Sequence, residues 1–523
     1  RDEDGNLIKT ETVVGQESLS LGKSSNSRRT TYLEASINYA RTFGRHSVGA
    51  LFLYQHSQKN YINTSESDPD KFLPYRNQGI AGRVTYDYDN RYFVEANFGY
   101  NGSENFSPGN RFGFFPSVAA GWAISEEPFF ESAKNVVDLL KIKASYGLVG
   151  NDQIGGDRRF IYLETIEDGY TYYFGSANTL YQGIRLGDYP NPNVGWETVR
   201  KFNVGLDFSL FGKLKIQADY FNDYRSGIFL QATSIPEIAG LTNKPYINVG
   251  KMHNEGFDAS IEYHQKFGQV DITARANFTY AHNTILDNDQ PDWEYLYQNR
   301  VGQSNWQTFG LVADGLFQSQ EEIDAWPKQQ FGEVKPGDIR YIDINGDGVV
   351  NDYDMKPIGF PNVPEISYGF GASVRYKGFD VSLFFQGVDN VNFFINNTYT
   401  QPFSATKSRH SNVFADLYGN YWTEDNRDAK YPRLTIGQSA NNSQTSTYWM
   451  VDGRYIRLKN AEIGYTLPKR IMQRAHIDRL RIYLSGMNLL TFSPFKLWDP
   501  DLQTGAANYP NNRIYNIGVT LVF

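Results

Sequence analysis

The chain has 523 residues, too many for one ordinary globular core, so it forms either several domains or one very large barrel. Its net charge is -8 with no basic block, which argues against a nucleic-acid partner, and its lack of cysteine excludes disulfides and thiolate metal sites. The mean hydropathy is -0.52, and no apolar run approaches the ~20 residues of a membrane-spanning helix.

Runs of alternating apolar and polar residues recur along the chain. In one of them, Val94 and Ala96 alternate with Glu95 and Asn97. Successive side chains of a strand point to opposite faces, so each run predicts a strand with one apolar and one polar face. We expect about fifteen strands, centred near 30–43, 46–60, 78–89, 91–104, 112–124, 139–151, 197–211, 212–230, 250–266, 269–286, 366–377, 378–391, 455–467, 480–492 and 512–523. Many last about ten residues or more, which is the length of a tilted transmembrane strand.

The connections between these runs alternate in length. One set is mostly short, near residues 43–44, 89–90, 211–212, 266–268 and 377–378, with longer members at 125–138 and 468–479. The other set is long, near residues 61–77, 152–196, 231–249, 286–365, 392–454 and 493–511, and only its link at 105–111 is modest. Short turns on one side and long loops on the other are typical of an outer-membrane antiparallel β-barrel with its long loops outside the cell.

The last run ends the chain on an aromatic residue. Its apolar face carries Tyr515, Ile517, Val519, Leu521 and Phe523. A strand that closes a barrel in lipid needs an apolar outer face, so we expect the first four of these side chains to face lipid and Phe523 to lie near the periplasmic rim. The alternative for this strand alone is the edge of an ordinary β-sandwich.

A calcium-loop pattern lies in the longest connection. Residues 343–354 read DINGDGVVNDYD and match D-x-[DN]-x-[DN]-G at the first six positions. The oxygen ligands would be the side chains of Asp343, Asn345, Asp347, Asn351 and Asp354 and the carbonyl of Val349. Position 12 is Asp354 rather than the longer Glu, and no helical pattern flanks the loop. We expect a structural calcium or similar hard cation here; the alternative is an Asx-rich turn that binds nothing.

No pattern of catalytic residues stands out. The histidines are scattered, and there is no H-E-x-x-H, G-x-S-x-G or phosphate-binding loop, so we expect neither an enzyme nor an organic cofactor. The long loops carry aromatic residues that either pack the loops or stack on sugars or peptides, and packing is the favoured interpretation. These residues are Trp293, Tyr295, Tyr297, Trp306 and Trp326.

Several stretches, taken in order, resemble the C-terminal part of SusC/RagA-type TonB-dependent outer-membrane transporters of Bacteroidota. They are FFPSVAAGW at 114–122, ISEEPF at 124–129, SYGLVGN at 145–151, NPNVGWE at 191–197, NVGKMHNEGFD at 248–258, GLF at 315–317, GDIRYIDINGDG at 337–348 and RYIRLKN at 454–460. Because they span nearly the whole chain, the resemblance implies that residues 1–523 are one portion of a single barrel of about 22 strands.

The resemblance also implies partners and a mechanism. The transporter would be energised by TonB through an N-terminal part, with the signal peptide, plug and first strands lying outside this chain. A SusD-like lipoprotein lid would sit outside, outer-membrane lipid would surround the wall, and the cargo would be an oligosaccharide or a peptide. The residues that contact the cargo are not identified by the sequence. Two alternatives stay open: a passive porin, and an outer-membrane adhesin or enzyme that uses the long loops.

Overall fold

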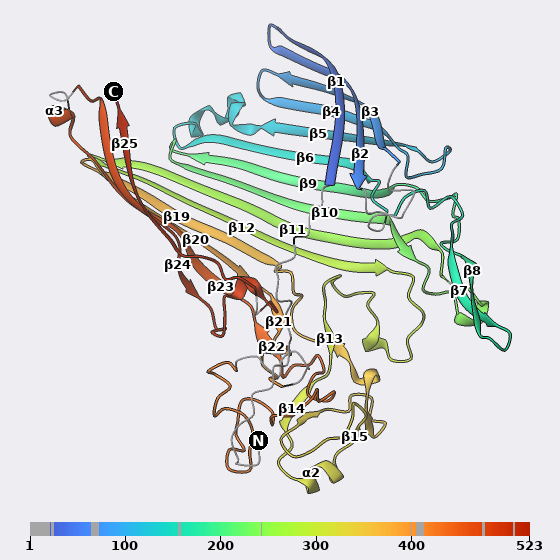
Figure 1. Cartoon of the computed structure of the whole chain (residues 1–523). Helices are drawn as coiled ribbons and strands as arrows, with labels where there is room; N and C mark the ends of the chain where they lie inside the picture. Colours follow the sequence, from blue (N-terminus) through green and yellow to red (C-terminus); the bar gives the residue numbers. More distant parts are fainter. Residues whose placement is uncertain are drawn as a thin grey trace.

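The computed structural model describes residues 21, 26–63, 73–154, 158–241, 243–397, 399–403, 413–472, 476–505 and 508–523. The main element of the structure is one 15-stranded sheet, in which each strand is antiparallel to its neighbours (Figure 1). The strand order follows the chain, with β7, β8, β13–β18, β21 and β22 left out of the sheet. Within the described residues, β1 and β25 are the two edges.

The strands of the sheet confirm the prediction, because each predicted run overlaps one of them. Their bounds are β1 (Asn26–Phe43), β2 (His46–Asn63), β3 (Tyr75–Tyr88), β4 (Tyr92–Ser103), β5 (Phe112–Ala123), β6 (Val137–Asn151), β9 (Glu197–Leu210), β10 (Leu214–Gln231), β11 (Tyr246–Phe267), β12 (Val270–Asp287), β19 (Ile366–Tyr376), β20 (Phe379–Asp389), β23 (Tyr455–Thr466), β24 (Arg479–Phe492) and β25 (Ile514–Val522).

The short turns explain why the register of the sheet is so regular. Asp89 and Asn90 both have positive φ, and so do Phe211 and Gly212. Two successive left-handed residues form a turn whose twist matches that of the flanking strands. Only three residues separate the paired strand ends, which are Tyr88 and Tyr92 in one hairpin and Leu210 and Leu214 in the other. The register then runs without slips from Leu214 to Ser226 along β10, which keeps apolar and polar side chains on separate faces.

The long connections carry the remaining elements. Two strands form a separate hairpin, β7 (Ile166–Phe174) and β8 (Thr179–Leu186). The others are short: β13 (Phe309–Gly310), β14 (Ala313–Leu316), β15 (Lys328–Gln329), β16 (Ile339–Tyr341), β17 (Val349–Val350), β18 (Lys356–Pro357), β21 (Asn392–Phe394) and β22 (Met450–Asp452). The helices are α2 (Gln320–Ala325) and α3 (Lys469–Met472), with short 3₁₀ segments η1 (Ile124–Glu126), η2 (Pro128–Ala133), η3 (Glu237–Ala239), η4 (Leu296–Gln298), η5 (Asp352–Asp354) and η8 (Pro500–Leu502).

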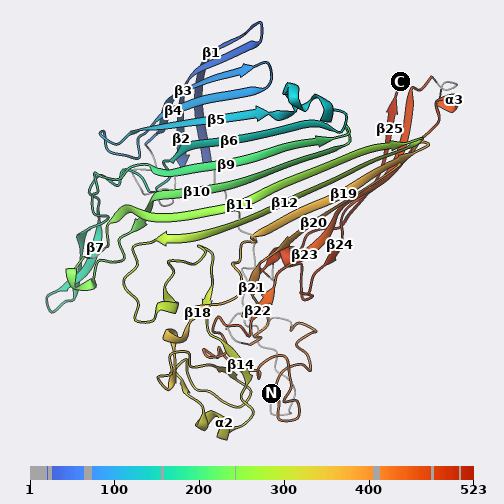
Figure 2. The same ribbon diagram turned by 180° about the vertical axis from the view of Figure 1, so that it is seen from behind.

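The two ends of the sheet differ. The C-terminus and α3 lie at one end, whereas the long loops gather at the other, around β13, β14, β15, β21 and β22 (Figures 1 and 2). The buried hydrophobic residues also gather in the loops, and few belong to the sheet. No helix among the described residues is long and apolar enough to cross a membrane.

Candidate functional site

Charged side chains on the polar face of the sheet pair across neighbouring strands. The Lys143 ammonium on β6 lies 2.9 Å from Asp207 on β9 and 3.4 Å from Asp219 on β10. The Arg83 guanidinium on β3 lies 2.6 Å from Glu95 on β4. The face is therefore charged but largely self-paired, as suits the interior of a barrel that holds water or protein.

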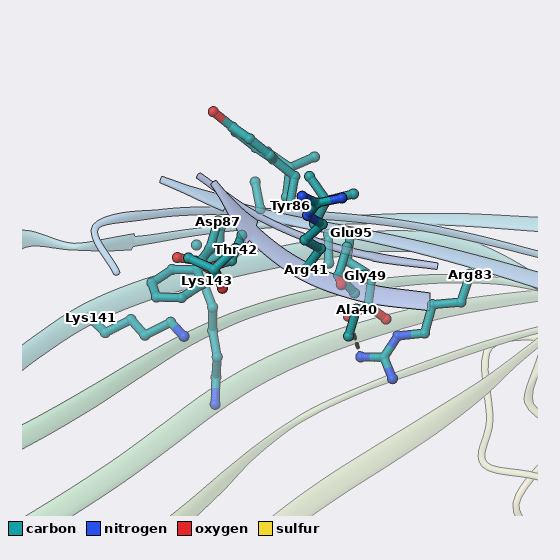
Figure 3. A pocket seen from close by; sticks show the side chains of 18 residues that line it. Ala40, Arg41, Thr42, Gly49, Arg83, Tyr86, Asp87, Glu95, Lys141 and Lys143 are labelled. Atoms are coloured by element: carbon teal, nitrogen blue, oxygen red, sulfur yellow. Dashed lines mark hydrogen bonds and ion pairs between the residues drawn. The ribbon is translucent and has the colours of Figure 1, made fainter. Parts of the chain in front are cut away.

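One hollow on the sheet, near β1, shows the separation of the two faces. Figure 3 shows Lys141, Lys143 and Arg83 on one side of the strands and Tyr86 on the other. The Lys141 ammonium lies 3.9 Å from the centre of the Phe93 ring, a cation–π contact on the polar face. Because successive side chains of each strand point to opposite faces, the sheet has one polar and one apolar face, as the sequence predicts.

A glycine makes room for an ionic group that links three strands on this face. Arg481 on β24 reaches across β23 to Asp380 on β20, with Nε 3.1 Å from Oδ1, and its guanidinium also lies 2.5 Å from Glu462. A Cβ added at Gly464 on β23 would lie 2.5 Å from that guanidinium. A side chain at position 464 would therefore require the Arg481 guanidinium to shift.

The opposite face of the sheet is apolar and exposed. On β25 it carries Tyr515, Ile517, Val519 and Leu521, which are 73%, 76%, 64% and 41% exposed. Within the part of the chain that the structure describes, no layer of protein covers these side chains, so there they do not form the inner face of a sandwich. An exposed apolar row is what the outer surface of a membrane barrel requires, so the structure agrees with the prediction that this row faces lipid.

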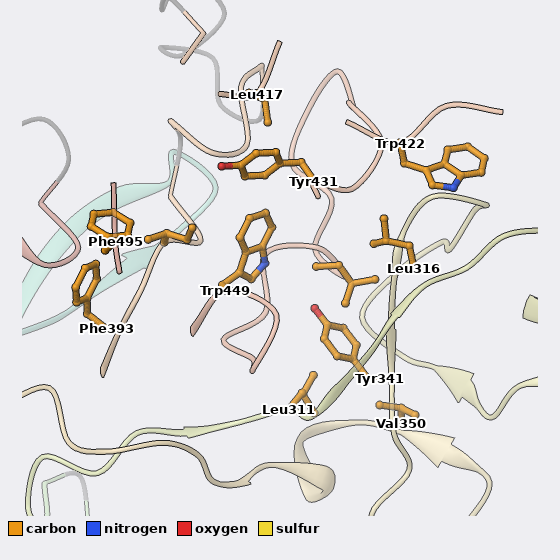
Figure 4. Packing of buried hydrophobic residues seen from close by; sticks show 12 residues of the cluster. Leu311, Leu316, Tyr341, Val350, Phe393, Leu417, Trp422, Tyr431, Trp449 and Phe495 are labelled. Carbon is orange, nitrogen blue, oxygen red and sulfur yellow. The ribbon is translucent and has the colours of Figure 1, made fainter. Parts of the chain in front are cut away.

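Three long loops share one hydrophobic core at the loop end of the sheet, and we call this region the loop lobe. It comprises the described residues of 288–365, 390–454 and 493–511. Its buried residues are Leu311, Leu316, Ile339, Tyr341, Val350, Phe393, Ile395, Leu417, Trp422, Tyr431, Trp449 and Phe495 (Figure 4). The loops therefore fold on one another rather than extending separately into water.

A buried ion pair holds two of these loops together. Asp338 is fully buried, and its Oδ1 lies 2.8 Å from Arg433 Nε. The Asn442 side chain donates to Asp338 Oδ1 at 2.8 Å, and the Lys335 backbone N–H donates to Oδ2 at 2.8 Å. A buried carboxylate needs such partners because an unpaired charge in a low-dielectric interior is costly.

Amides continue this network into the core. The Gln329 side chain donates to the Ile339 carbonyl at 3.0 Å and accepts from the Tyr341 N–H at 2.6 Å. The Tyr341 hydroxyl donates to the Asn441 carbonyl at 2.8 Å. Burial raises the pKa of Tyr341 above its usual value, so the phenol keeps its proton and stays a donor.

The third loop is anchored to the wall by a buried arginine. The Arg457 guanidinium on β23 lies 2.5 Å from Asp499 and 2.8 Å from Asp501, and its side chain is 2% exposed. Phe495 from the same loop packs into the core of the loop lobe, with its ring centre 5.0 Å from that of Phe393. The loop lobe is therefore fixed to the sheet as well as to itself.

The predicted calcium loop forms a compact turn within the loop lobe. Asp343 accepts from the N–H groups of Gly346 at 2.7 Å and Gly348 at 2.8 Å. The Asn345 side chain donates to Asp347 Oδ2 at 3.0 Å. Gly346 and Gly348 have positive φ, which allows the sharp turn.

The second half of this loop is organised by Asp354. That carboxylate is fully buried and accepts from the N–H groups of Ile344 at 2.7 Å and Asn351 at 2.8 Å. Asn351 caps η5 by accepting from the Tyr353 N–H, and the Val349 N–H donates to Asp347. Asp354 thus closes the loop on itself, which its short side chain can do without a metal.

The fit of this loop to calcium is partial. Across the described parts of the chain, no three His, Cys, Asp or Glu side chains are grouped so as to hold a metal ion. The carboxylate oxygens of Asp343 and Asp347 each accept one hydrogen bond and keep a free lone pair, whereas Asp354 Oδ1 accepts from two N–H groups. The predicted ligands also include amide and backbone oxygens. Burial, together with the negative charges of Asp354, Asp347 and Asp343, raises the pKa of Tyr297. The three carboxylates therefore all lie near this tyrosine. The calcium site stays a prediction.

The loop aromatics divide into two groups. Trp326 donates its indole N–H to the Tyr341 carbonyl at 2.7 Å, and Tyr297 donates its hydroxyl to the Tyr353 carbonyl at 2.6 Å. Tyr295 stacks on Tyr297 with ring centres 5.5 Å apart. These three confirm the packing interpretation. Trp293 and Trp306 remain 43% and 52% exposed.

Sequence reasoning did not identify the polar network of the loop lobe. Asp338 and Arg433 are 95 residues apart, and Asp338 and Asn442 are 104 apart. No local spacing rule connects such distant residues. The only available signal was the GDIRYIDINGDG stretch itself, whose Asp338, Ile339 and Tyr341 are fully buried.

Comparisons with known proteins agree with this architecture. A family profile described as "TonB dependent receptor-like, beta-barrel" matches residues 4–489. The chain is 27% identical to TonB-dependent receptor P3 of Formosa agariphila over 94% of this chain and 52% of that protein. It is 26% identical to TonB-dependent receptor SusC of Bacteroides thetaiotaomicron over 84% of this chain and 43% of that protein.

A solved structure shows the same fold. The RagAB peptide transporter superposes with a TM-score of 0.72 at 22% identity, over 95% of this chain and 55% of that chain. The chain spans about half the length of the curated relatives it matches. The family is one of outer-membrane transporters rather than enzymes, and the SusC-like relatives come from Gram-negative bacteria. The chain therefore belongs to the TonB-dependent receptor-like β-barrel family and is part of an outer-membrane protein.

Proposed function

We propose that this chain provides the wall and the external loops of an active importer of oligomeric nutrients. The importer would be energised by TonB and would work with a SusD-like surface lipoprotein. One observation carries the proposal: a wall with a polar, self-paired face ends in a co-folded loop lobe at one end only. A wall for diffusion alone has no need of so large a folded structure at its mouth.

The relatives support the same proposal. Those to which the chain is similar are named TonB-dependent receptors, and SusC is one of them. The structural neighbour is named a peptide transporter and carries two components in its name. At 22% identity that neighbour informs the fold alone, so glycans and peptides both stay within the proposal.

The two described regions take different roles in this mechanism. The loop lobe would capture cargo beneath the lipoprotein, because exposed loop surfaces on a rigid scaffold are where binding residues concentrate. Movement of a plug, driven by TonB, would then open a path along the polar face. Exposed side chains such as Trp293 and Trp306 offer apolar contact to either cargo.

The proposal is tested by uptake of labelled oligosaccharides and peptides into cells that carry the full-length transporter. Cells lacking TonB, and cells lacking the lipoprotein, are the comparison strains. We expect uptake of the true cargo to fall at least tenfold without TonB. Undiminished uptake without TonB would reject active import and leave a passive porin.

A further inference from the structure

The negative charge of the chain is concentrated in one connection. Residues 288–365, between β12 and β19, contain fourteen Asp and Glu against five Lys and Arg, a net charge of -9. The whole chain has 58 acidic and 50 basic residues, which leaves 44 and 45 elsewhere and a net charge of +1 there. The connection belongs to the loop lobe, at the end of the sheet opposite the C-terminus (Figure 2). The rest of the chain is therefore close to neutral, whereas this loop is acidic.

Only some of these carboxylates are paired. The Arg340 guanidinium lies 2.8 Å from Asp314 and 3.5 Å from Glu322. The Lys335 ammonium lies 3.2 Å from Glu333. Three exposed carboxylates of the same connection have no cation partner among the described residues, so they stay available to a positively charged ligand. They are Asp292, Glu294 and Asp352.

These three carboxylates lie on two segments that the fold brings together. The residues just before η4 carry two of them, and η5 carries the third. The Tyr297 hydroxyl donates to the Tyr353 carbonyl at 2.6 Å, and the Gln298 side chain donates to the Asp352 carbonyl at 2.9 Å. These bonds join positions that are 56 and 54 apart in the sequence. The two segments therefore form one continuous surface.

Exposed aromatic rings neighbour these carboxylates. Trp293 follows Asp292 and is 43% exposed, and Tyr353 follows Asp352 and is 48% exposed. Tyr295, two residues after Trp293, has its ring centre 5.9 Å from that of Tyr353. We call this region the acidic–aromatic surface. It consists of Asp292, Trp293, Glu294, Tyr295, Asp352 and Tyr353.

The combination fits a positively charged group at the end of an aliphatic stem. The carboxylates attract the charge, a ring face attracts the cation, and the stem packs on the ring. The loop itself contains such a cation–ring contact, because the Arg300 guanidinium lies 4.7 Å from the centre of the Phe309 ring. Lys and Arg side chains have this stem, whereas the amine of an amino sugar is attached directly to the sugar ring. The surface therefore favours a peptide.

Nearby positive charges do not neutralise this surface. Arg300 lies on the Phe309 ring, and Lys356 on β18 is a single charge beside the three carboxylates. A calcium ion bound to residues 343–354 would add two positive charges, but the predicted ligands include none of the three. The connection would then still carry a net charge of -7. Its acidic character does not depend on whether the predicted calcium site is occupied.

A surface with one sign of charge also acts before contact. It raises the rate at which oppositely charged ligands arrive and lowers the rate for ligands of like charge, and salt weakens both effects. Each exposed ion pair contributes little by itself. A ligand that carries several positive groups therefore gains the most.

We propose that the acidic–aromatic surface binds positively charged side chains of the cargo, so that the transporter prefers cationic peptides to neutral or anionic peptides of equal length. The inference rests on the proposed function for the step of import. Asp292, Glu294 and Asp352 attract the charge, while Trp293 and Tyr353 offer the ring faces.

Binding of labelled peptides to the full-length transporter tests this preference. The transporter is isolated in mild detergent with any bound lipoprotein retained. The probes are three peptides of equal length, built on Gly and Ser, with Lys, Gln or Glu at every second position. At low salt we expect the Lys peptide to bind about tenfold more tightly than the Gln peptide, and the Glu peptide to bind most weakly. Added salt should reduce these differences.

Equal affinities for the three peptides at low salt would overturn the inference. A glucosamine oligomer with the same number of amines is the fourth probe. If it binds as tightly as the Lys peptide, the surface recognises amines in general and the assignment to peptides is wrong.

Matched variants locate the preference on the surface. Asp292→Asn/Glu294→Gln/Asp352→Asn changes only exposed carboxylates, so the protein should fold normally. It should weaken binding of the Lys peptide about fivefold and leave the Gln peptide unchanged. The control removes the same three charges from other positions of the connection and should bind the Lys peptide almost as wild type does. It is Glu321→Gln/Asp324→Asn/Glu333→Gln.

Equal losses in the two triple variants would show that only the net charge matters, and would overturn the assignment to this surface. The ring variant Trp293→Ser/Tyr353→Ser keeps all the carboxylates. It should weaken the Lys peptide while the salt dependence of its binding stays the same, because the charges are intact.

Uptake into cells separates this inference from the proposed function. TonB-dependent uptake by a transporter that binds the three peptides equally would overturn the charge preference and leave active import in place. Binding that prefers the Lys peptide and is lost in the triple variant, together with TonB-independent uptake, would support the surface and reject the proposed mechanism of import.

Discussion

The wall and the loop lobe are built by different rules. In the wall, side chains alternate between a polar face and an exposed apolar face, and backbone pairing joins each strand to the next. In the loop lobe, Trp449, Tyr341 and Phe393 are almost fully buried, as in the core of a soluble domain. One chain therefore joins a structure made for lipid to one made for water.

The two regions also differ in how strongly charged side chains affect stability. On the wall, ion pairs such as Lys143–Asp207 are partly exposed on the polar face, where surface pairs contribute little. In the loop lobe, Asp338 is fully buried, so loss of one of its partners would leave a buried charge unpaired and destabilise the fold. The wall should therefore tolerate polar-face changes that the loop lobe does not.

The largest expected loss of stability follows from removing the Trp449 side chain from the loop lobe. This side chain is 1% exposed, donates its indole N–H to the Asn442 carbonyl at 2.7 Å and lies against Tyr448. Trp449→Ala should destabilise the loop lobe by about 3–5 kcal/mol through the cavity it leaves. Protease added to intact cells should cut the loop lobe rapidly, while the barrel keeps its heat-modifiable migration on gels. Simultaneous loss of both would show that the two regions fold as one unit.

The next largest effect tests the two faces of the wall. Ile517→Arg places a charge on the apolar face and should cost about 2–4 kcal/mol if the position lies near the bilayer midplane. Asn516→Arg, one residue away on the polar face, should cost little. Urea-dependent folding into lipid vesicles measures both. Equal costs for the two variants would contradict the assignment of faces.

A smaller effect is expected from the buried ion pair of the loop lobe. Asp338→Ala leaves the Arg433 guanidinium, now 2.8 Å from the carboxylate, without its charge partner. Since Arg433 is 24% exposed, water offsets part of the loss, and we expect about 2–3 kcal/mol. Denaturant titration of the loop lobe, followed by tryptophan fluorescence, gives the value. Asp338→Asn is the control, because it keeps the shape and should recover part of the stability.

These regions also differ in how far sequence predicts them. Alternation, short turns and the matching stretches predict every strand of the sheet, because side-chain period and turn length are local properties. The core of the loop lobe depends on contacts between residues such as Tyr341 and Asn441, which are 100 positions apart. The irregular segments around them have no period to detect. Their aromatic content predicts that they pack, but not against which partner.

The smallest expected effect belongs to the calcium loop. If calcium binds, it should stabilise the loop lobe by about 1.4 kcal/mol when its free concentration is ten times the dissociation constant. Isothermal calorimetry on the full-length protein should show calcium uptake that Asp343→Ala/Asp347→Ala removes. Glu333→Ala/Glu321→Ala, which removes two carboxylates of the loop lobe outside residues 343–354, should leave the uptake intact.

A second readout separates specific binding from loose ion association. Burial and the three carboxylates raise the pKa of Tyr297, and a calcium ion among those carboxylates would oppose their negative charge. Calcium should therefore lower the pH at which Tyr297 ionises, whereas sodium at equal ionic strength should change it less. Ultraviolet difference titration of wild type against Tyr297→Phe isolates this residue from the other tyrosines. A wild type with no calorimetric uptake and no change at Tyr297 would leave residues 343–354 as a turn that is closed by its own hydrogen bonds, without calcium.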